Sequence, residues 1–191
     1  MTIETPQNFL GLDARLSRYA TARVVVLPVP YDGTSTYGKG ADRGPEAFLR
    51  ASTQVEFFDE ELLTSPCEMG IATLPPVAVA ADPAQMVAAT LSAARRVVQD
   101  GKRLFGIGGE HSISIGLLRA VAERHGRLSI LQIDAHADLR DSYDGTIYNH
   151  ACVMKRALDD GHQVVPVAIR AFSLEEHALI ERVASSRSMA I

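Results

Sequence analysis

The sequence predicts an α/β fold in which three layers, α/β/α, surround a mainly parallel sheet. Short runs rich in valine and isoleucine alternate with longer segments whose apolar residues recur at helical spacing. Glycine and proline mark the junctions between these segments. Strands that alternate with helices of about 10 to 15 residues form βαβ units. The sheet should therefore be parallel and covered by helices on both faces.

The first predicted strand is Ala22–Pro30, a valine-rich run that ends in prolines. A long glycine-rich loop follows it. Pro45 then suits the first turn of a short helix over residues 46–52, because its missing N–H has no partner to lose there. The pair Asp82–Pro83 supplies a cap and a first helical residue for the next helix, which should end near Gly101.

Three further pairs of strand and helix follow in the second half of the chain. No internal repeat, linker or low-complexity tract interrupts them, so residues 1–191 are expected to form a single domain. The predicted strands are 103–109, 128–134 and 163–169, and the predicted helices are 112–126, 150–161 and 174–184.

The composition excludes several classes of protein. Hydrophobic residues make up 47% and charged residues 22% of the sequence. The net charge is −4, and the charged residues form no block of one sign, which argues against a nucleic-acid partner. The N-terminus lacks the features of a signal peptide, and no apolar run is long enough to span a membrane. Cys67 and Cys152 form no CxxC pair, so we expect buried, reduced thiols in a cytoplasmic protein.

Charged residues follow two of the predicted strands. Asp134, His136 and Asp138 come at alternate positions after one strand, and His111 follows the glycines Gly108 and Gly109 after the preceding strand. In parallel sheets the carboxyl ends of the strands share one edge, where ligands bind. The two segments are therefore expected at the same edge of the sheet.

A divalent cation accounts for this arrangement, since side chains at i, i+2 and i+4 of an extended chain converge on one side. Carboxylates and imidazoles crowded in a partly buried pocket repel or titrate unless a cation is present. Mixed ligands of this kind suit manganese, iron or zinc. The alternative is that the strand simply reaches solvent. Complete dinucleotide, Walker, HExxH and GxSxG motifs are absent.

The pair of segments resembles the metal-ligand motifs of the ureohydrolases, the family of arginase and agmatinase. The resemblance runs from about Phe9 to Val183 and is nearer to agmatinase than to arginase. It rests on the segments "GGEHS", "DAHADLRD", "PVPYDGTSTYGKGADRGPEAFLRAS", "YNHACVMKRAL" and "PVAIRAFSLEE". It implies an arginase-like fold and hydrolysis of a guanidino group at two Mn²⁺ ions, for example agmatine to putrescine plus urea.

The resemblance also implies roles for single residues. His111 would bind one metal ion and His136 the other, Asp134 would bridge them, and Asp138 would complete the first. His150 matches the histidine that passes a proton to the leaving amine, and Glu110 would support its neighbour His111. The loop with Asp141, Asp144, Tyr148 and Asn149 should face substrate, with most of its side chains solvated. We expect His125, His162 and His177 at the surface.

One departure from the family is clear. Its later SxDxDxxDP motif is missing, and the sequence contains no Asp-x-Asp at all. Residues 1–191 are therefore expected to form an incomplete domain of low activity. We favour a fragment of an agmatinase-like enzyme over the alternative, a natural short form that does not catalyse the reaction and that assembles with or regulates a complete subunit. An in-frame SxDxDxxDP downstream would identify a fragment. Other possible substrates are guanidinobutyrate, formimidoylglutamate and aminopropylagmatine, and the full-length protein is expected to be a homo-oligomer.

Overall fold

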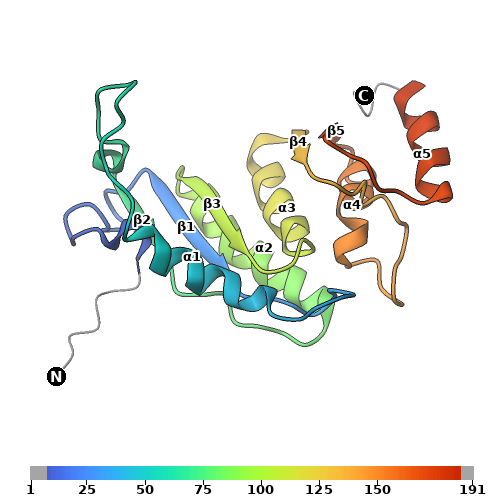
Figure 1. The fold of residues 1–191 in the computed structure, drawn as a ribbon, viewed down its shortest axis with the longest axis horizontal. Helices are drawn as coiled ribbons and strands as arrows, with labels where there is room; N and C mark the ends of the chain where they lie inside the picture. The colour runs from blue at the N-terminus through green and yellow to red at the C-terminus, as the bar shows by residue number, and fades with distance from the viewer. Residues whose placement is uncertain (1–7, 186–191) are drawn as a thin grey trace.

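A computed structural model describes residues 8–185, in which parallel strands alternate with helices (Figure 1). This confirms the predicted α/β class. The α-helices are α1 Gly44–Ser52, α2 Pro83–Gln99, α3 Ile113–His125, α4 Val153–Asp159 and α5 Leu174–Ser185. The strands are β1 Val24–Val29, β2 Ile71–Thr73, β3 Arg103–Gly108, β4 Ser129–Ile133 and β5 Gln163–Val167. Short 3₁₀ helices are η1 Phe9–Gly11, η2 Ala41–Arg43, η3 Pro66–Met69 and η4 His150–Cys152.

The first sheet has the order β2-β1-β3, and all of its pairs are parallel. Val24 pairs with Ile71 on one side and with Arg103 on the other. Strand β2 was not predicted from the sequence, because a strand of three residues followed by prolines carries too few positions to show a period.

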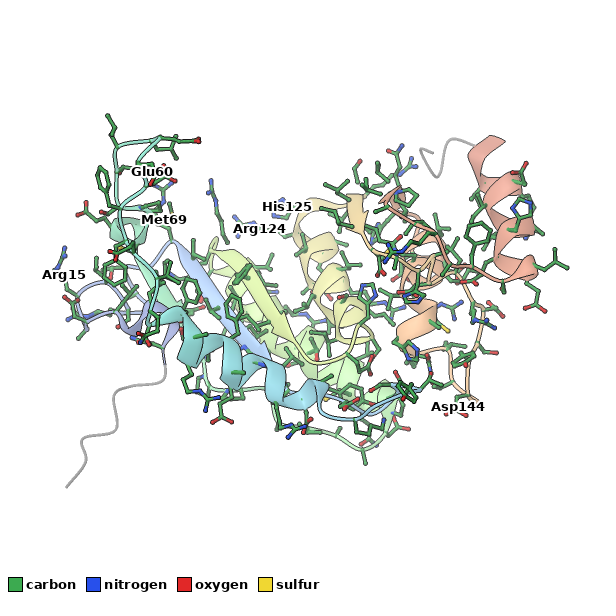
Figure 2. All side chains as sticks on the ribbon, viewed as in Figure 1. Arg15, Glu60, Met69, Arg124, His125 and Asp144 are labelled. Atoms are coloured by element: carbon green, nitrogen blue, oxygen red, sulfur yellow. The ribbon has the colours of Figure 1, made fainter. Side chains whose placement is uncertain are left out.

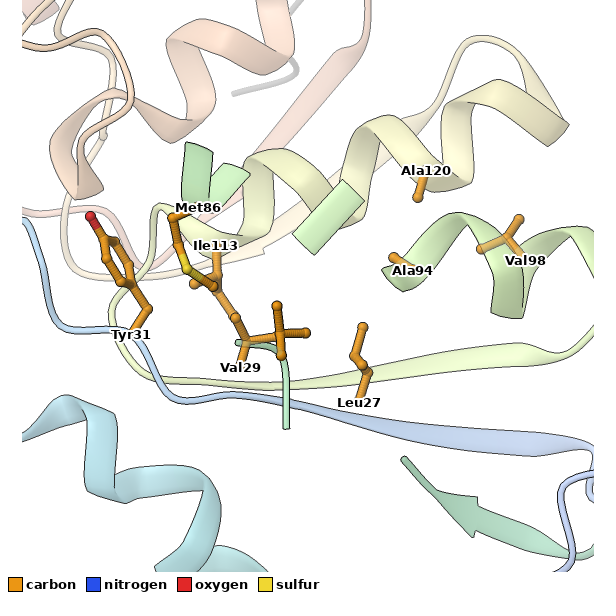
Figure 3. Packing of buried hydrophobic residues seen from close by; sticks show 9 residues of the cluster. Leu27, Val29, Tyr31, Met86, Ala94, Val98, Ile113 and Ala120 are labelled. Carbon is orange, nitrogen blue, oxygen red and sulfur yellow. The ribbon is translucent and has the colours of Figure 1, made fainter. Parts of the chain in front are cut away.

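Alternate residues of β1 supply the two faces of this sheet. Leu27 and Val29 pack with Met86 of α2 and Ile113 of α3 in one hydrophobic core (Figure 3). Val26 packs on the opposite face with Leu49 of α1 and Ile107 of β3, among others. Helices therefore cover both faces of the first sheet, as the fully apolar β1 predicts.

The second sheet contains β4 and β5, which are also parallel. Within residues 8–185 the strands thus form two parallel sheets, where the sequence suggested a single one. A separate hydrophobic core joins the second sheet to α3, α4 and α5 through residues such as Ile130, Val164 and Leu179. Leu131 and Ile133, on the other face of β4, are 62% and 75% exposed.

Several helix ends follow the sequence prediction. The Asp82 carboxylate caps α2 by accepting a hydrogen bond of 2.8 Å from the backbone N–H of Gln85, and Pro45 lies in the first turn of α1. The segment predicted as one helix over 150–161 differs, since it begins as η4 before α4 starts at Val153. The Asn149 side chain caps that 3₁₀ turn at the N–H of Ala151.

Two sequence expectations about single side chains have different outcomes. Cys67 and Cys152 are free and buried, as predicted. His162 was expected at the surface but is only 5% exposed, because it lies between the end of α4 and the start of β5. No helix in the described part of the chain is long and apolar enough to cross a membrane.

Candidate metal centre and active site

Close backbone contact between β1 and β3 places His111 at the edge of the first sheet. The N–H of Gly109 donates to the carbonyl of Val29, and the N–H of Glu110 donates to the carbonyl of Tyr31. A Cβ atom on Gly109 would lie 1.9 Å from the oxygen of Tyr31, so only glycine fits there. The glycines before His111 thus permit the close approach that the sequence suggested.

Three of the predicted metal ligands come together at this edge. His111 Nδ1 lies 2.7 Å from Asp138 Oδ2 and 3.5 Å from Asp134 Oδ2. Each of these residues offers one ligand atom within 4.8 Å of the others. The site is partly buried, since the Asp138 side chain is only 9% exposed and that of Asp134 is 23% exposed.

His136 lies beside this cluster but not within it. Its Nδ1 atom is 3.7 Å from Asp134 Oδ1, and its side chain is 67% exposed. The expectation of an extended chain through Asp134, His136 and Asp138 is wrong in detail. Strand β4 ends at Ile133, and Asp138 has a left-handed backbone with φ of 51°. The alternate positions therefore do not all project to the same side.

The unusual backbone of Asp138 is held by the start of α4. Its carbonyl oxygen accepts hydrogen bonds from the N–H groups of Met154 at 2.9 Å and Lys155 at 3.2 Å. Aspartate tolerates left-handed φ values better than most residues. The backbone of Asp138 thus links the second sheet to α4, while its carboxylate faces His111.

Electrostatics make the cluster attractive to a cation. Burial lowers the pKa of the His111 imidazole, but its hydrogen bond to Asp138 and the charges of Asp138, Asp134 and Glu110 outweigh burial. The pKa of His111 therefore lies above its ordinary value. An imidazole that carboxylates surround in this way binds either a proton or a metal ion.

A cavity of about 360 Å³ opens beside the cluster. His136 and Asp138 line it, and so do Tyr143 and His150 from further along the chain. The ring of Tyr143 meets that of His150 edge-on, with 5.9 Å between the centroids. The predicted proton-transfer residue His150 therefore shares a cavity with two of the predicted metal ligands.

Glu176 was not identified from the sequence, although its motif was visible. Its carboxylate accepts hydrogen bonds from the N–H of Ser173 at 2.7 Å and of Leu139 at 3.0 Å. The Ser173 hydroxyl in turn accepts from the N–H of Glu176. This is a capping box, readable as Ser-x-x-Glu at the start of α5. The Glu176 carboxylate also binds the N–H of Leu139, the residue that follows Asp138.

The remaining predicted residues fall into two groups. Glu110 is buried and accepts hydrogen bonds from Ser112 and from Thr34, a residue that carried no signal in the sequence. The loop after β4 is mostly solvated as expected, and Figure 2 shows Asp144 at its tip. Asn149 differs from that expectation, because it is fully buried as a cap.

Comparison with known proteins identifies the family. A sequence model of the arginase family matches residues 22–190. The chain belongs to the arginase family. It is 45% identical over 184 residues to an N(1)-aminopropylagmatine ureohydrolase from Synechocystis sp., covering 92% of this chain and 59% of that protein. It is 40% identical over 172 residues to the enzyme of the same name from Thermus thermophilus, covering 86% and 56%.

A solved member of the family has the same fold. The agmatine ureohydrolase of Thermoplasma volcanium superposes with a TM-score of 0.79 at 32% identity, over 93% of this chain and 59% of that one. The chain therefore spans somewhat more than half the length of the arginase-family relatives that it matches.

Proposed function

We propose that this chain carries the metal-binding and proton-transfer residues of a ureohydrolase that releases urea from N(1)-aminopropylagmatine. The observation that carries this proposal is the cluster of His111, Asp134 and Asp138 beside a cavity that His150 also lines. The two relatives at 45% and 40% identity support the aminopropyl substrate. Agmatine, the substrate expected from the sequence, is the second candidate and is supported by the Thermoplasma volcanium enzyme.

The donor set fits manganese. Nitrogen from an imidazole and oxygens from two carboxylates, with no thiolate among them, suit Mn²⁺. His111, Asp134 and Asp138 would hold the ion, and His136 stands at the open side of the same group. When bound, the metal supplies Lewis-acid activation of the water that attacks the guanidino carbon.

Protein side chains supply the other requirements of the reaction. A guanidinium is always charged near neutral pH, so carboxylates along the cavity favour its entry. Asp138 and Glu176 both line the cavity. The Asp138 carboxylate also contacts His111, and the Glu176 carboxylate also accepts a hydrogen bond from the N–H of Leu139. His150, which lines the same cavity, would give a proton to the leaving amine nitrogen, which must be protonated when its bond to carbon breaks.

Urea release tests the proposal and separates it from its alternatives. The purified chain with Mn²⁺ is offered each substrate at equal concentration, beside an Asp134→Asn variant. We expect metal-dependent urea release that is faster from aminopropylagmatine than from agmatine and is lost in the variant. The release should be slow, because the chain lacks the Asp-x-Asp motif. Release at a normal enzymatic rate would contradict the low activity. Metal binding with no urea from either substrate would favour a non-catalytic metal-binding protein.

We also propose that the full-length protein is a homo-oligomer in the cytoplasm. The support comes from the family to which the chain belongs. Analytical ultracentrifugation of the full-length protein tests this assignment, and a monomer at micromolar concentration would contradict it.

A further inference from the structure

The hydroxyl of Thr34 connects two parts of the candidate site that are far apart in sequence. Thr34 lies in the loop after β1 and is 8% exposed. Its Oγ1 atom donates a hydrogen bond of 2.9 Å to Glu110 Oε1. The same oxygen accepts from the backbone N–H of His150 at 3.0 Å and lies 3.3 Å from Nδ1 of the His150 ring.

The loop that carries Thr34 is held in place by its own side chains. The Asp32 carboxylate accepts hydrogen bonds from the N–H groups of Gly40 and Ala41. The Lys39 ammonium donates to the carbonyl oxygens of Asp32 and Ser35. These contacts connect the two ends of the loop and hold Thr34 between them.

Glu110 is placed to accept the Thr34 hydrogen. Its Oε2 atom accepts from the N–H of Ser112 at 2.7 Å, and its Oε1 atom accepts from the Ser112 hydroxyl at 2.6 Å as well as from Thr34. A carboxylate is an acceptor only, and this one meets three donors. The single hydrogen of the Thr34 hydroxyl is therefore directed to Glu110.

This direction determines what Thr34 can offer His150. A hydroxyl has one hydrogen and two lone pairs. One lone pair receives the backbone N–H of His150, and the other faces Nδ1. Because the hydroxyl has no hydrogen left to donate, the contact is favourable only if Nδ1 carries the hydrogen.

We propose that Thr34 is a positioning residue that holds neutral His150 in the Nδ1–H tautomer. Nε2 is then the ring atom that accepts and releases a proton. Thr36 lies 3.4 Å from Nε2 and has a hydroxyl that can rotate to donate to it. The catalytic use of Nε2 rests on the proposed ureohydrolase function. The assignment of the tautomer rests only on the hydrogen bonds of Thr34.

Nitrogen NMR of the purified chain tests the tautomer directly. The histidines are labelled with ¹⁵N, and correlation of ring nitrogens with ring carbon-bound hydrogens is recorded at a pH where His150 is neutral. The His150 signals are identified by their loss in His150→Asn. We expect hydrogen on Nδ1 in the unaltered chain. Hydrogen predominantly on Nε2 would overturn the proposal without any substitution at Thr34.

Three variants separate positioning from a general effect on structure. Thr34→Val removes the hydroxyl at similar volume and should lower the ratio of Nδ1–H to Nε2–H by about fivefold, the weight of one ordinary hydrogen bond. Thr34→Ser keeps a hydroxyl and should restore the ratio. Thr36→Val removes the other nearby hydroxyl and should leave Nδ1–H dominant. An unchanged ratio in a folded Thr34→Val chain would also overturn the proposal.

The readout stays independent of the proposed function. If the chain released no urea from either substrate, the tautomer of His150 would still be measured. If urea release occurred but His150 carried its hydrogen on Nε2, the function would stand and the role of Thr34 would fall.

Discussion

The Nδ1 atom of His111 lies 2.7 Å from Oδ2 of Asp138, although 27 positions separate the two residues in the chain. The first follows β3 and the second belongs to the turn after β4, so this contact joins the edges of the two sheets. Asp134 completes the group at 3.5 Å. The cluster therefore depends on how the turn after β4 is folded as much as on the ligands themselves.

Replacing Asp138 with asparagine should weaken Mn²⁺ binding by about 100-fold. Removing a residue that only supports a metal ligand already lowers the affinity by about 10- to 100-fold, so the loss of a ligand carboxylate should reach the upper end of that range. The change removes one negative charge and leaves a neutral amide oxygen. Asparagine also tolerates the left-handed backbone at this position, so the fold should be retained. Isothermal titration calorimetry of the purified chain measures the affinity.

Asp144→Asn is the matched control for this prediction. Asp144 also has a left-handed backbone, with φ of 50°, and is exposed at the tip of the loop (Figure 2). The same charge is removed there without touching the cluster. Equal losses of affinity in both variants would show that net charge, not the cluster, attracts the metal.

Replacing Glu176 with alanine should lower the free energy of unfolding by about 2 kcal/mol, because two N–H groups lose their acceptor. Those groups belong to Ser173 and Leu139, so both the start of α5 and the turn after Asp138 are affected. Chemical denaturation measures the loss. Glu175→Ala alters the exposed neighbour in the same helical turn and should cost much less. Similar losses would mean that the capping box contributes little.

Local patterns predicted the parts of this structure that local interactions determine. Valine-rich runs became β1 and β5, and Asp82 caps α2 as its position before Pro83 indicated. The four candidate metal ligands could be proposed from the sequence because each of them follows one of two predicted strands, β3 or β4. Features set by distant partners were not predictable in this way.

Three residues show why. Asp138 turns left-handed because α4 binds its carbonyl group, which a strand pattern cannot reveal. Thr34 meets His150 across 116 positions, and nothing in its own loop indicates that contact. His162 resembles any histidine near a glycine turn, yet tertiary packing buries it.

Stability should fall as the pH rises through the titration of Tyr19. Burial, the hydrogen bond to Asp100 and the charge of Asp100 raise the pKa of the Tyr19 phenol from 10.0 to about 12. Between these values the unfolded chain releases the phenolic proton and the folded chain keeps it. The contribution of Tyr19 to the free energy of unfolding is therefore fully present below pH 10 and is lost as the pH rises from there to about 12.

Urea denaturation across this range measures the effect. Tyr19→Phe has no phenolic proton, so its stability should depend less steeply on pH above 10 than that of the unaltered chain. Tyr37→Phe changes a tyrosine that is 97% exposed and should keep the steep dependence. An unchanged dependence in Tyr19→Phe would contradict the assignment to this residue.

Manganese binding by the His111 variant is the most direct test of the metal centre. Electron paramagnetic resonance counts free Mn²⁺ in titrations of the unaltered chain, His111→Ala and His125→Ala. His125 is an exposed histidine at the far end of α3, away from the cluster (Figure 2). We predict that the unaltered chain and His125→Ala bind Mn²⁺ and that His111→Ala does not. Binding that persists unchanged in His111→Ala would contradict a metal centre at this edge of the sheet.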